Sequence, residues 1–178
     1  MTDKAQAYYT YLFMPCFVTN LFVGFALQPL LVRLSKKWVH KEYKSFLKLC
    51  GMIVIGAIAI SAIIVVIGGI IGCPILSIIS GINLNKYRKE LIILLVGGGF
   101  FAMVVIEQVI LTVMRKQQFL LLGFIIASIT AMICSNPMVK SMQLQGAGMA
   151  YTTSAIVLCV VLGIMIVVLY LKEKRNNN

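Results

Sequence analysis

Long stretches without a single charged residue dominate this sequence. The charge-free runs cover residues 5–32, 49–85, 91–106, 117–139 and 141–171. A helix that crosses the roughly 30 Å hydrocarbon core of a bilayer needs about 20 apolar residues, because each residue rises about 1.5 Å. Transmembrane β-strands would instead show about ten residues of alternating polarity, which these runs lack. The sequence therefore predicts an all-α, polytopic membrane protein.

Five transmembrane helices are expected, forming a single helical domain over residues 1–178. Their predicted spans are 8–32, 46–71, 91–114, 119–134 and 147–171. The glycines and the proline of residues 68–74 are expected to break the second span before a short interfacial helix at 75–79. The Ser-Asn-Pro run at 135–137 is expected to end the fourth span.

The overall composition supports lipid as the main surroundings of the chain. Hydrophobic residues make up 61% of it and charged residues only 12%, against about half and a quarter in soluble domains. The net charge of +11 fits basic membrane loops, so nucleic-acid binding is not expected. The five cysteines form no CxxC pair and indicate neither a disulfide framework nor a metal site. No motif of a known enzyme class and no cofactor signature occurs, so an enzyme is not expected.

Basic residues are distributed unevenly between the loops. Eleven fall on one side of the five predicted spans: Arg33, Lys36, Lys37, Lys41, Lys44, Lys48, Arg115, Lys116, Lys172, Lys174 and Arg175. Five fall on the other side: Lys4, Lys86, Arg88, Lys89 and Lys140. The tendency of Lys and Arg to stay inside predicts a cytoplasmic C-terminus and an external N-terminus. That orientation is more natural for the C-terminal part of a longer transporter than for a complete protein.

Glu107 is the first candidate for a functional residue, because it lies inside the third predicted span. It precedes Arg115 by eight residues, or roughly 12 Å along a helix. A carboxylate in hydrocarbon is costly unless it is paired, protonated or hydrated. We expect Glu107 and the following Gln108 to line a hydrated path for a substrate or an ion. A structural hydrogen bond to a neighbouring helix is the alternative.

Two prolines and two amides mark the first predicted span. Pro15 and Pro29 each remove a backbone donor, so kinks are expected there. Asn20 and Gln28 would then form a polar bend facing a cavity, as broken helices do beside transporter substrate sites. A static kink without a functional role is equally compatible with the sequence.

Gly97, Gly98 and Gly99 follow one another within the third predicted span. Three glycines in a row allow either a helix bend or the close approach of another backbone. The second alternative, tight packing, is the favoured interpretation.

The segment 33–48 is predicted to be an interfacial helix joining the first two spans. Trp38 and Tyr43 suit the headgroup level of a membrane, and the surrounding cations suit anionic lipid. Contact between Arg33 and a phosphate-bearing substrate at the cytoplasmic mouth is the functional alternative.

Several segments resemble those of bacterial oligosaccharide flippases, in order and in spacing. They read FMPCFVTNLFVGFALQPLLVRLSKKW (13–38), EYKSFLKL (42–49), GCPILSIISG (72–81), LTVMRKQ (111–117) and QGAGMAYTTS (145–154). Over essentially its whole length, the chain resembles the C-terminal portion of a polysaccharide biosynthesis flippase of the Wzx type. This type belongs to the multidrug/oligosaccharidyl-lipid/polysaccharide exporter superfamily.

The resemblance implies a function and partners that composition alone does not give. Such proteins have two lobes of six helices that alternate access to a central cavity in the bacterial cytoplasmic (inner) membrane. They flip undecaprenyl-pyrophosphate-linked oligosaccharide for polysaccharide or lipopolysaccharide biosynthesis. This chain would supply five helices of the second lobe, which leaves an N-terminal lobe missing. Arg33 and Arg115 at the mouth, with Glu107 and Gln108 deeper inside, are the expected contacts of the substrate.

Two other functions remain open at this point. A cation-coupled multidrug exporter of the same superfamily would also use an acidic residue such as Glu107 inside the membrane. A non-transporting membrane subunit or an inactive fragment is favoured by the odd number of spans and the missing lobe.

Overall fold

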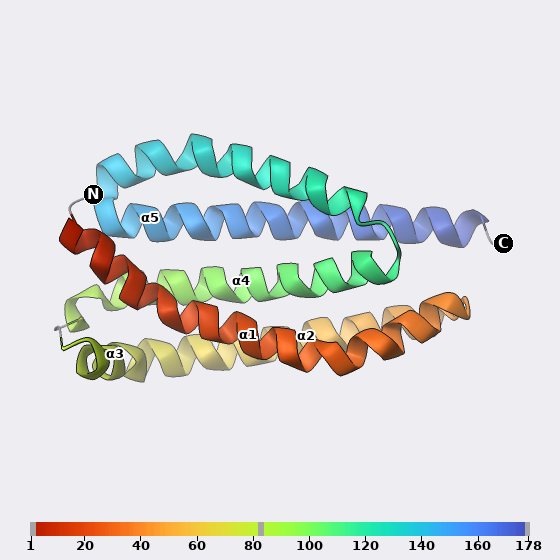
Figure 1. Cartoon of the computed structure of the whole chain (residues 1–178), viewed down its shortest axis with the longest axis horizontal. Coiled ribbons are helices and arrows are strands. Elements are labelled where there is room, and N and C mark those ends of the chain that lie inside the picture. The colour runs from red at the N-terminus through yellow and green to blue at the C-terminus, as the bar shows by residue number, and fades with distance from the viewer. Residues whose placement is uncertain (1–2, 82–83, 177–178) are drawn as a thin grey trace.

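The computed structural model describes residues 3–81 and 84–176, and it is helical through almost all of them. Its elements are α1 (Asp3–Val39), α2 (Tyr43–Ile67), a π-helical turn (Gly68–Gly72), α3 (Cys73–Ser80), a short 3₁₀ turn (Asn85–Tyr87), α4 (Arg88–Val113) and α5 (Gln118–Asn176) (Figure 1). Five stretches within these described ranges are long and apolar enough to cross a membrane. The predicted all-α, polytopic fold is therefore confirmed.

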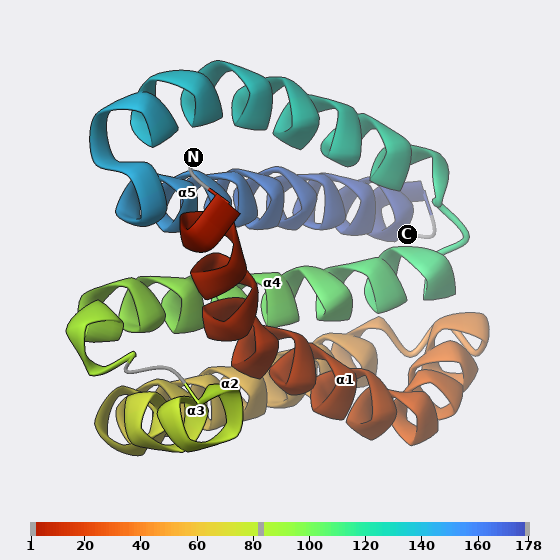
Figure 2. The same ribbon diagram turned by 60° about the vertical axis from the view of Figure 1, so that its left-hand side comes forward.

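Helix α5 reverses its direction near its middle, so that it supplies two of the five spans. Figures 1 and 2 show its two limbs side by side. The first limb covers Gln118–Lys140 and the second limb Leu144–Arg175. Gly146 makes the reversal possible, because a Cβ atom there would overlap the backbone of Met138. In a straight helix these two residues would lie roughly 12 Å apart along the axis.

The fourth predicted span therefore ends too early. Helical structure continues past the Ser-Asn-Pro run at 135–137 as far as the reversal, and Pro137 lies inside the helix. Proline removes one backbone donor but does not force a helix to end when the surrounding chain remains packed. The small residue that allows the turn is Gly146, which lies nine positions further on.

The expected break between α2 and α3 is also absent. Residues 68–72 widen into a π-helical turn, and the chain stays helical as far as Ser80. Only the helical nature of segment 75–79 was predicted correctly. The helix ends at Gly81, whose φ of +67° lies in the left-handed region that glycine adopts without a steric penalty.

The π-helical turn is held against the beginning of α4. Arg88 donates a hydrogen bond from Nε to the carbonyl oxygen of Gly69, at 2.6 Å. A Cβ atom on Gly72 would lie 2.9 Å from Leu91 Cδ2. The glycines that were expected to break the span therefore let α4 approach closely instead.

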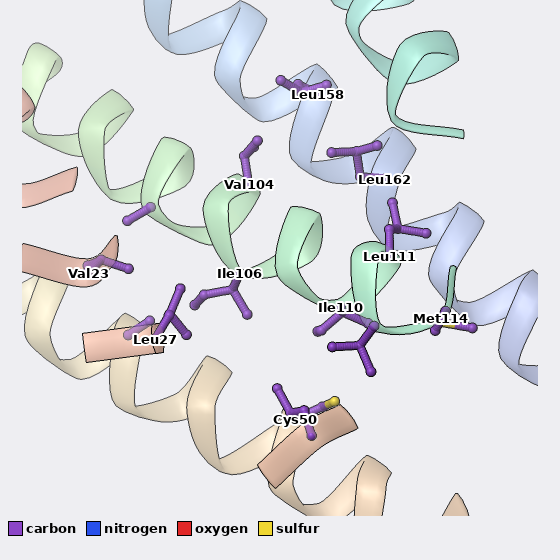
Figure 3. Packing of buried hydrophobic residues seen from close by; sticks show 14 of the residues in the cluster. Val23, Leu27, Cys50, Val104, Ile106, Ile110, Leu111, Met114, Leu158 and Leu162 are labelled. Carbon is purple, nitrogen blue, oxygen red and sulfur yellow. The ribbon is translucent and has the colours of Figure 1, made fainter. Parts of the chain in front are cut away.

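Helix α4 is the central element of the bundle. Figure 3 shows Ile106 and Ile110 on its side toward α1 and α2, and Leu111 on its side toward α5. The buried cluster around these residues includes Leu27 of α1 and Leu162 of α5. A helix that is apolar on all sides suits this position, since every face of α4 meets another helix or lipid.

Each of the three consecutive glycines of α4 faces a different helix. A Cβ atom built on them would lie 2.6 Å from Thr152 Oγ1 of α5 (Gly97), 3.2 Å from Cys16 Cβ of α1 (Gly98) and 3.2 Å from Ser61 Cβ of α2 (Gly99). Successive positions of an α-helix point about 100° apart, so one triplet serves three neighbours. Figure 1 shows α4 as a nearly straight helix, so these glycines serve close packing rather than a bend.

The two groups of basic loops lie at opposite ends of the bundle. The α1–α2 turn, the α4–α5 turn and the C-terminal end of α5 share one end, which we call the basic end (Figure 1). There the rings of Trp38 and Tyr43 lie 5.5 Å apart, and those of Tyr43 and Tyr170 lie 6.3 Å apart. Aromatic residues at this level are typical of membrane interfaces. The Lys4 side chain, counted at the other end, lies outside the described residues.

Candidate functional site

A cleft lined by hydroxyl groups lies between the start of α1 and the two limbs of α5. Its volume is about 640 Å³, and its walls carry Tyr9, Ser135, Tyr151 and Ser154 among small apolar residues. We call it the hydroxyl-lined cleft. Val139 and Ala147 line it, so it lies beside the α5 reversal, which Figure 2 shows at the end of the bundle away from the basic end. Four hydroxyl-bearing side chains in one cleft are unusual in a chain that is otherwise so apolar.

Tyr151 is the best-positioned side chain of the cleft. Its ring meets Phe13 of α1 edge-on at 5.1 Å and lies 6.4 Å from the ring of Phe101 of α4. Gly97 provides the space behind it, because a Cβ atom there would lie 2.9 Å from the Tyr151 ring. Contacts with α1 and α4 thus fix the ring of Tyr151, and this tyrosine is one of the polar side chains that line the cleft.

Asn20 contributes a further polar side chain from the middle of α1. Its side chain lies close to that of Tyr151. Its Oδ1 is buried and has no hydrogen-bond partner within residues 3–81 and 84–176. A buried acceptor without a partner costs about 1–3 kcal/mol, so Asn20 Oδ1 is an unsatisfied polar atom close to Tyr151.

A smaller cavity continues the cleft between the two limbs of α5. It has a volume of about 220 Å³, shares Ala131, Tyr151 and Ser154 with the cleft, and adds Ser128. Ser154 donates its hydroxyl proton to the carbonyl oxygen of Ala150 at 2.8 Å. The hydroxyl oxygen can still accept a hydrogen bond, since a hydroxyl carries two lone pairs.

Glu107 lies apart from the cleft, between α4 and the second limb of α5. Cys159 donates a weak hydrogen bond from Sγ to Glu107 Oε1 at 3.6 Å. Gly163 leaves room for the carboxylate, because a Cβ atom there would lie 3.2 Å from the same oxygen. The second oxygen, Oε2, is buried without a hydrogen-bond partner in the part of the chain that the structure describes. Among the described residues, Glu107 is thus a carboxylate within the bundle that forms no ion pair.

The other predicted site residues do not gather at one place. Gln28 is exposed on α1, and Gln108 is half-buried beside Glu107. Arg33 and Arg115 are both exposed at the basic end. Of the predicted residues, the structure therefore brings both arginines to the basic end, and Asn20 lies close to Tyr151 without lining the cleft.

Pro15 and Pro29 both lie inside the continuous helix α1. Figure 2 shows that α1 curves along its length. The Thr19 hydroxyl donates a hydrogen bond to the carbonyl oxygen of Pro15 at 2.8 Å, a contact that often accompanies a bent helix. Asn20 follows directly, so the polar position lies within this curved part of α1.

The cleft residues were missed in the sequence because serine and tyrosine are ordinary in transmembrane helices. The one available signal was the segment 145–154, which places Tyr151 and Ser154 one helical turn apart. Ser135 gave no such signal, because its place in the cleft depends on the reversal of α5. Glu90 was missed as well, although its Oε2 is buried and has no hydrogen-bond partner among the described residues.

No protein-family profile, no curated protein and no solved structure matches this chain. The similarity to oligosaccharide flippases therefore rests on the sequence segments alone, and the chemistry of the cleft has to be judged by itself.

Proposed function

We propose that the chain acts in a membrane transporter that flips lipid-linked oligosaccharide across the bacterial cytoplasmic membrane for polysaccharide biosynthesis. The observation that carries the proposal is the hydroxyl-lined cleft inside an apolar bundle of five membrane-spanning helices. A sugar headgroup cannot enter hydrocarbon, because its hydroxyl groups would lose their hydrogen bonds with water. A transporter must therefore replace these bonds along a polar route.

The chemistry of the cleft suits a sugar. Tyr9 and Tyr151 each combine an apolar ring with a polar tip, and such rings can pack against the apolar faces of sugar rings. Ser135, Ser154 and Asn20 add small polar groups at its walls and edge. An apolar cleft with a few convergent polar groups is the usual form of a small-molecule site.

The basic end suits the phosphates of the same substrate. Arg33 and Arg115 are exposed there, and guanidinium groups bind phosphate oxygens through paired hydrogen bonds. With the proposed orientation, this end faces the cytoplasm, the N-terminus lies outside and the cleft lies toward the outer leaflet. A lipid-linked sugar would meet the arginines first and the cleft afterwards.

A second lobe is part of the proposal. The cleft is open on one side of the bundle, and hydroxyl groups that face hydrocarbon without partners are costly. A second helical lobe facing the cleft, as in the family that the sequence resembles, would enclose a hydrated cavity.

Complementation of a flippase-deficient bacterial strain tests this function. Two proteins are expressed separately, the chain alone and the chain fused to a candidate second lobe, and the amount of surface polysaccharide is measured for each. The proposal expects restored polymer export from the fusion and at least a tenfold loss with Tyr151→Phe plus Ser154→Ala, about the cost of one or two hydrogen bonds. Tyr11→Phe, on the same helix as Tyr9 but outside the cleft, is the matched control. Full export by the double variant would overturn the assignment of the cleft.

A cation-coupled exporter is the second candidate, and Glu107 favours it. Its unpartnered Oε2 lies within the bundle, where ionisable residues commonly act as proton or ion carriers. Glu107→Gln separates the two functions when drug efflux and polysaccharide export are measured in parallel. Loss of drug efflux with unchanged polymer export would favour the exporter.

A further inference from the structure

A second, apolar groove lies between α1 and α2, on the side of the bundle opposite the second limb of α5. Its volume is about 620 Å³. Its floor consists of buried side chains, with Leu27 exposed by 4%, Ala57 by 7% and Ile106 by 1%. Figure 3 shows Ile106 of α4 beside Leu27 of α1 at this floor. Its rims are exposed, with Phe22 at 70% and Met52 at 57%.

The groove is uniformly apolar and elongated. Thr19 is its one polar lining residue within the described chain, and the Thr19 hydroxyl is already bonded to the carbonyl oxygen of Pro15. Along α2 the lining runs from Leu49 to Ile64, roughly 22 Å at about 1.5 Å per residue. A long apolar slot of this kind suits a single hydrocarbon chain and has no donor to offer a polar ligand.

Two cations, Arg33 and Lys48, are placed to extend this groove at the basic end. Arg33 follows the lining residue Leu30 by three positions on α1, and Lys48 precedes the lining residue Met52 by four positions on α2. Residues three or four apart share one face of a helix, so both cations extend the groove walls at the basic end. Both side chains are exposed. The groove thus matches an amphiphile with one hydrocarbon chain and an anionic head.

We propose that the α1–α2 groove binds the hydrocarbon chain of a phosphate-bearing lipid, with the phosphate held by Arg33 and Lys48. The inference rests on the proposed function, because it makes this lipid the carrier of the transported sugar. The lipid chain would lie along α1 and α2 while the sugar is handed to the hydroxyl-lined cleft on the other side of α1. The two parts of the substrate would thus occupy different surfaces of the bundle.

Gly56 allows a sharp test, because it lines the groove and a Cβ atom there meets nothing within 4 Å. Gly56→Phe should fill the groove without disturbing the helices. Gly51→Phe is the matched control on the same helix, since Gly51 has equally open space and does not line the groove. Ala26→Phe fills the groove from α1 and serves if Gly56→Phe fails to fold.

The readout is lipid retained by the purified chain in detergent, measured by native mass spectrometry with undecaprenyl phosphate as the probe. Gly56→Phe should lower retention about tenfold, the cost of losing about two buried methylene contacts, and Gly51→Phe should not. Arg33→Gln with Lys48→Gln should lower retention of undecaprenyl phosphate and leave that of uncharged undecaprenol unchanged. Equal lipid retention by Gly56→Phe and Gly51→Phe would overturn the proposal that the groove binds the lipid chain. Binding of inorganic phosphate as tight as that of undecaprenyl phosphate would overturn it as well, because the hydrocarbon chain would then contribute nothing.

Two further outcomes separate this inference from others. If the groove holds a helix of a second copy, the chain will run as a dimer that Gly56→Phe dissociates without changing lipid retention, which overturns the inference. Lipid retention can be measured without transport. Normal lipid retention by a chain that fails to restore polysaccharide export would contradict the proposed function and would still support lipid binding in the groove.

Discussion

The hydroxyl of Thr152 lies 3.0 Å from the carbonyl oxygen of Ile93, which joins the second limb of α5 to the backbone of α4. Gly97, one helical turn after Ile93, makes this contact possible. A Cβ atom on Gly97 would lie 2.6 Å from the same hydroxyl and 2.9 Å from the Tyr151 ring. The packing of α4 and the position of a cleft residue therefore depend on one glycine.

Gly97→Ala should destabilise the bundle by about 1–3 kcal/mol, because the new methyl group overpacks the α4–α5 contact. Gly24→Ala is the control, since a Cβ atom at Gly24 meets nothing within 4 Å, and it should be neutral or slightly stabilising. Thermal unfolding of the detergent-solubilised chain measures both. An equal unfolding temperature for the two variants would contradict the packing described for Gly97.

Gly146→Ala should be the most damaging glycine substitution in the chain. A Cβ atom at this position would overlap the Met138 carbonyl, and this neighbour is backbone that cannot move aside. We expect a loss of about 4 kcal/mol or more, which is in the range of severe substitutions. The amount of folded chain recovered from membranes, compared with Gly148→Ala, is the measurement. Recovery equal to that of the Gly148 variant would mean that α5 does not reverse as described.

Glu107→Gln should raise the stability of the bundle. The carboxylate has one buried oxygen without a partner among the described residues, and a neutral amide avoids most of the cost of burying a charge. The unfolding temperature should rise by a few degrees, about 1 kcal/mol for a chain of this size. Glu42→Gln is the control, because Glu42 forms an exposed ion pair with Lys37 at 3.4 Å, and exposed pairs contribute little. A fall in the unfolding temperature would show that Glu107 is a structural residue.

Arg88→Ala should loosen the π-helical turn between α2 and α3. The hydrogen bond from Arg88 to Gly69 involves a charged donor, and such bonds contribute about 1.5–3 kcal/mol. Amide hydrogen exchange in residues 64–73 should therefore become at least about tenfold faster. Lys89→Ala, at the neighbouring exposed position, should leave the exchange rate unchanged. If both variants exchange equally fast, Arg88 does not hold this turn.

The sequence was sufficient for the fold class because the cost of placing charge in hydrocarbon leaves a visible pattern of charge-free runs. The number of spans and the grouping of basic loops at the two ends followed from the same pattern. Two helix ends were less predictable. Pro137 and the glycines at 68–72 are residues that break isolated helices, but the chain stays helical at both places, and α4 packs against the turn at 68–72.

The candidate site was harder to predict than the fold. Glu107 stands out in a sequence because a charge inside an apolar run is rare. Tyr9, Ser135 and Ser154 become neighbours only in the folded bundle. The predicted spans 119–134 and 147–171 implied a reversal between them, but they did not indicate which faces of the two limbs line a cleft. Asn20 was found for a different reason, its position between two prolines, and the structure places it close to Tyr151.

The proposed sugar route requires that water reach the hydroxyl-lined cleft inside this apolar bundle, and thiol labelling in intact membranes measures whether it does. In a chain whose five native cysteines are replaced, Ser154→Cys is compared with Ile164→Cys, an exposed position on the same limb. A membrane-impermeant maleimide applied from the outer side should modify the Ser154→Cys variant at least about tenfold faster than the Ile164→Cys variant, because thiols react as hydrated thiolates. Equal or absent labelling at both positions would contradict the proposed sugar route.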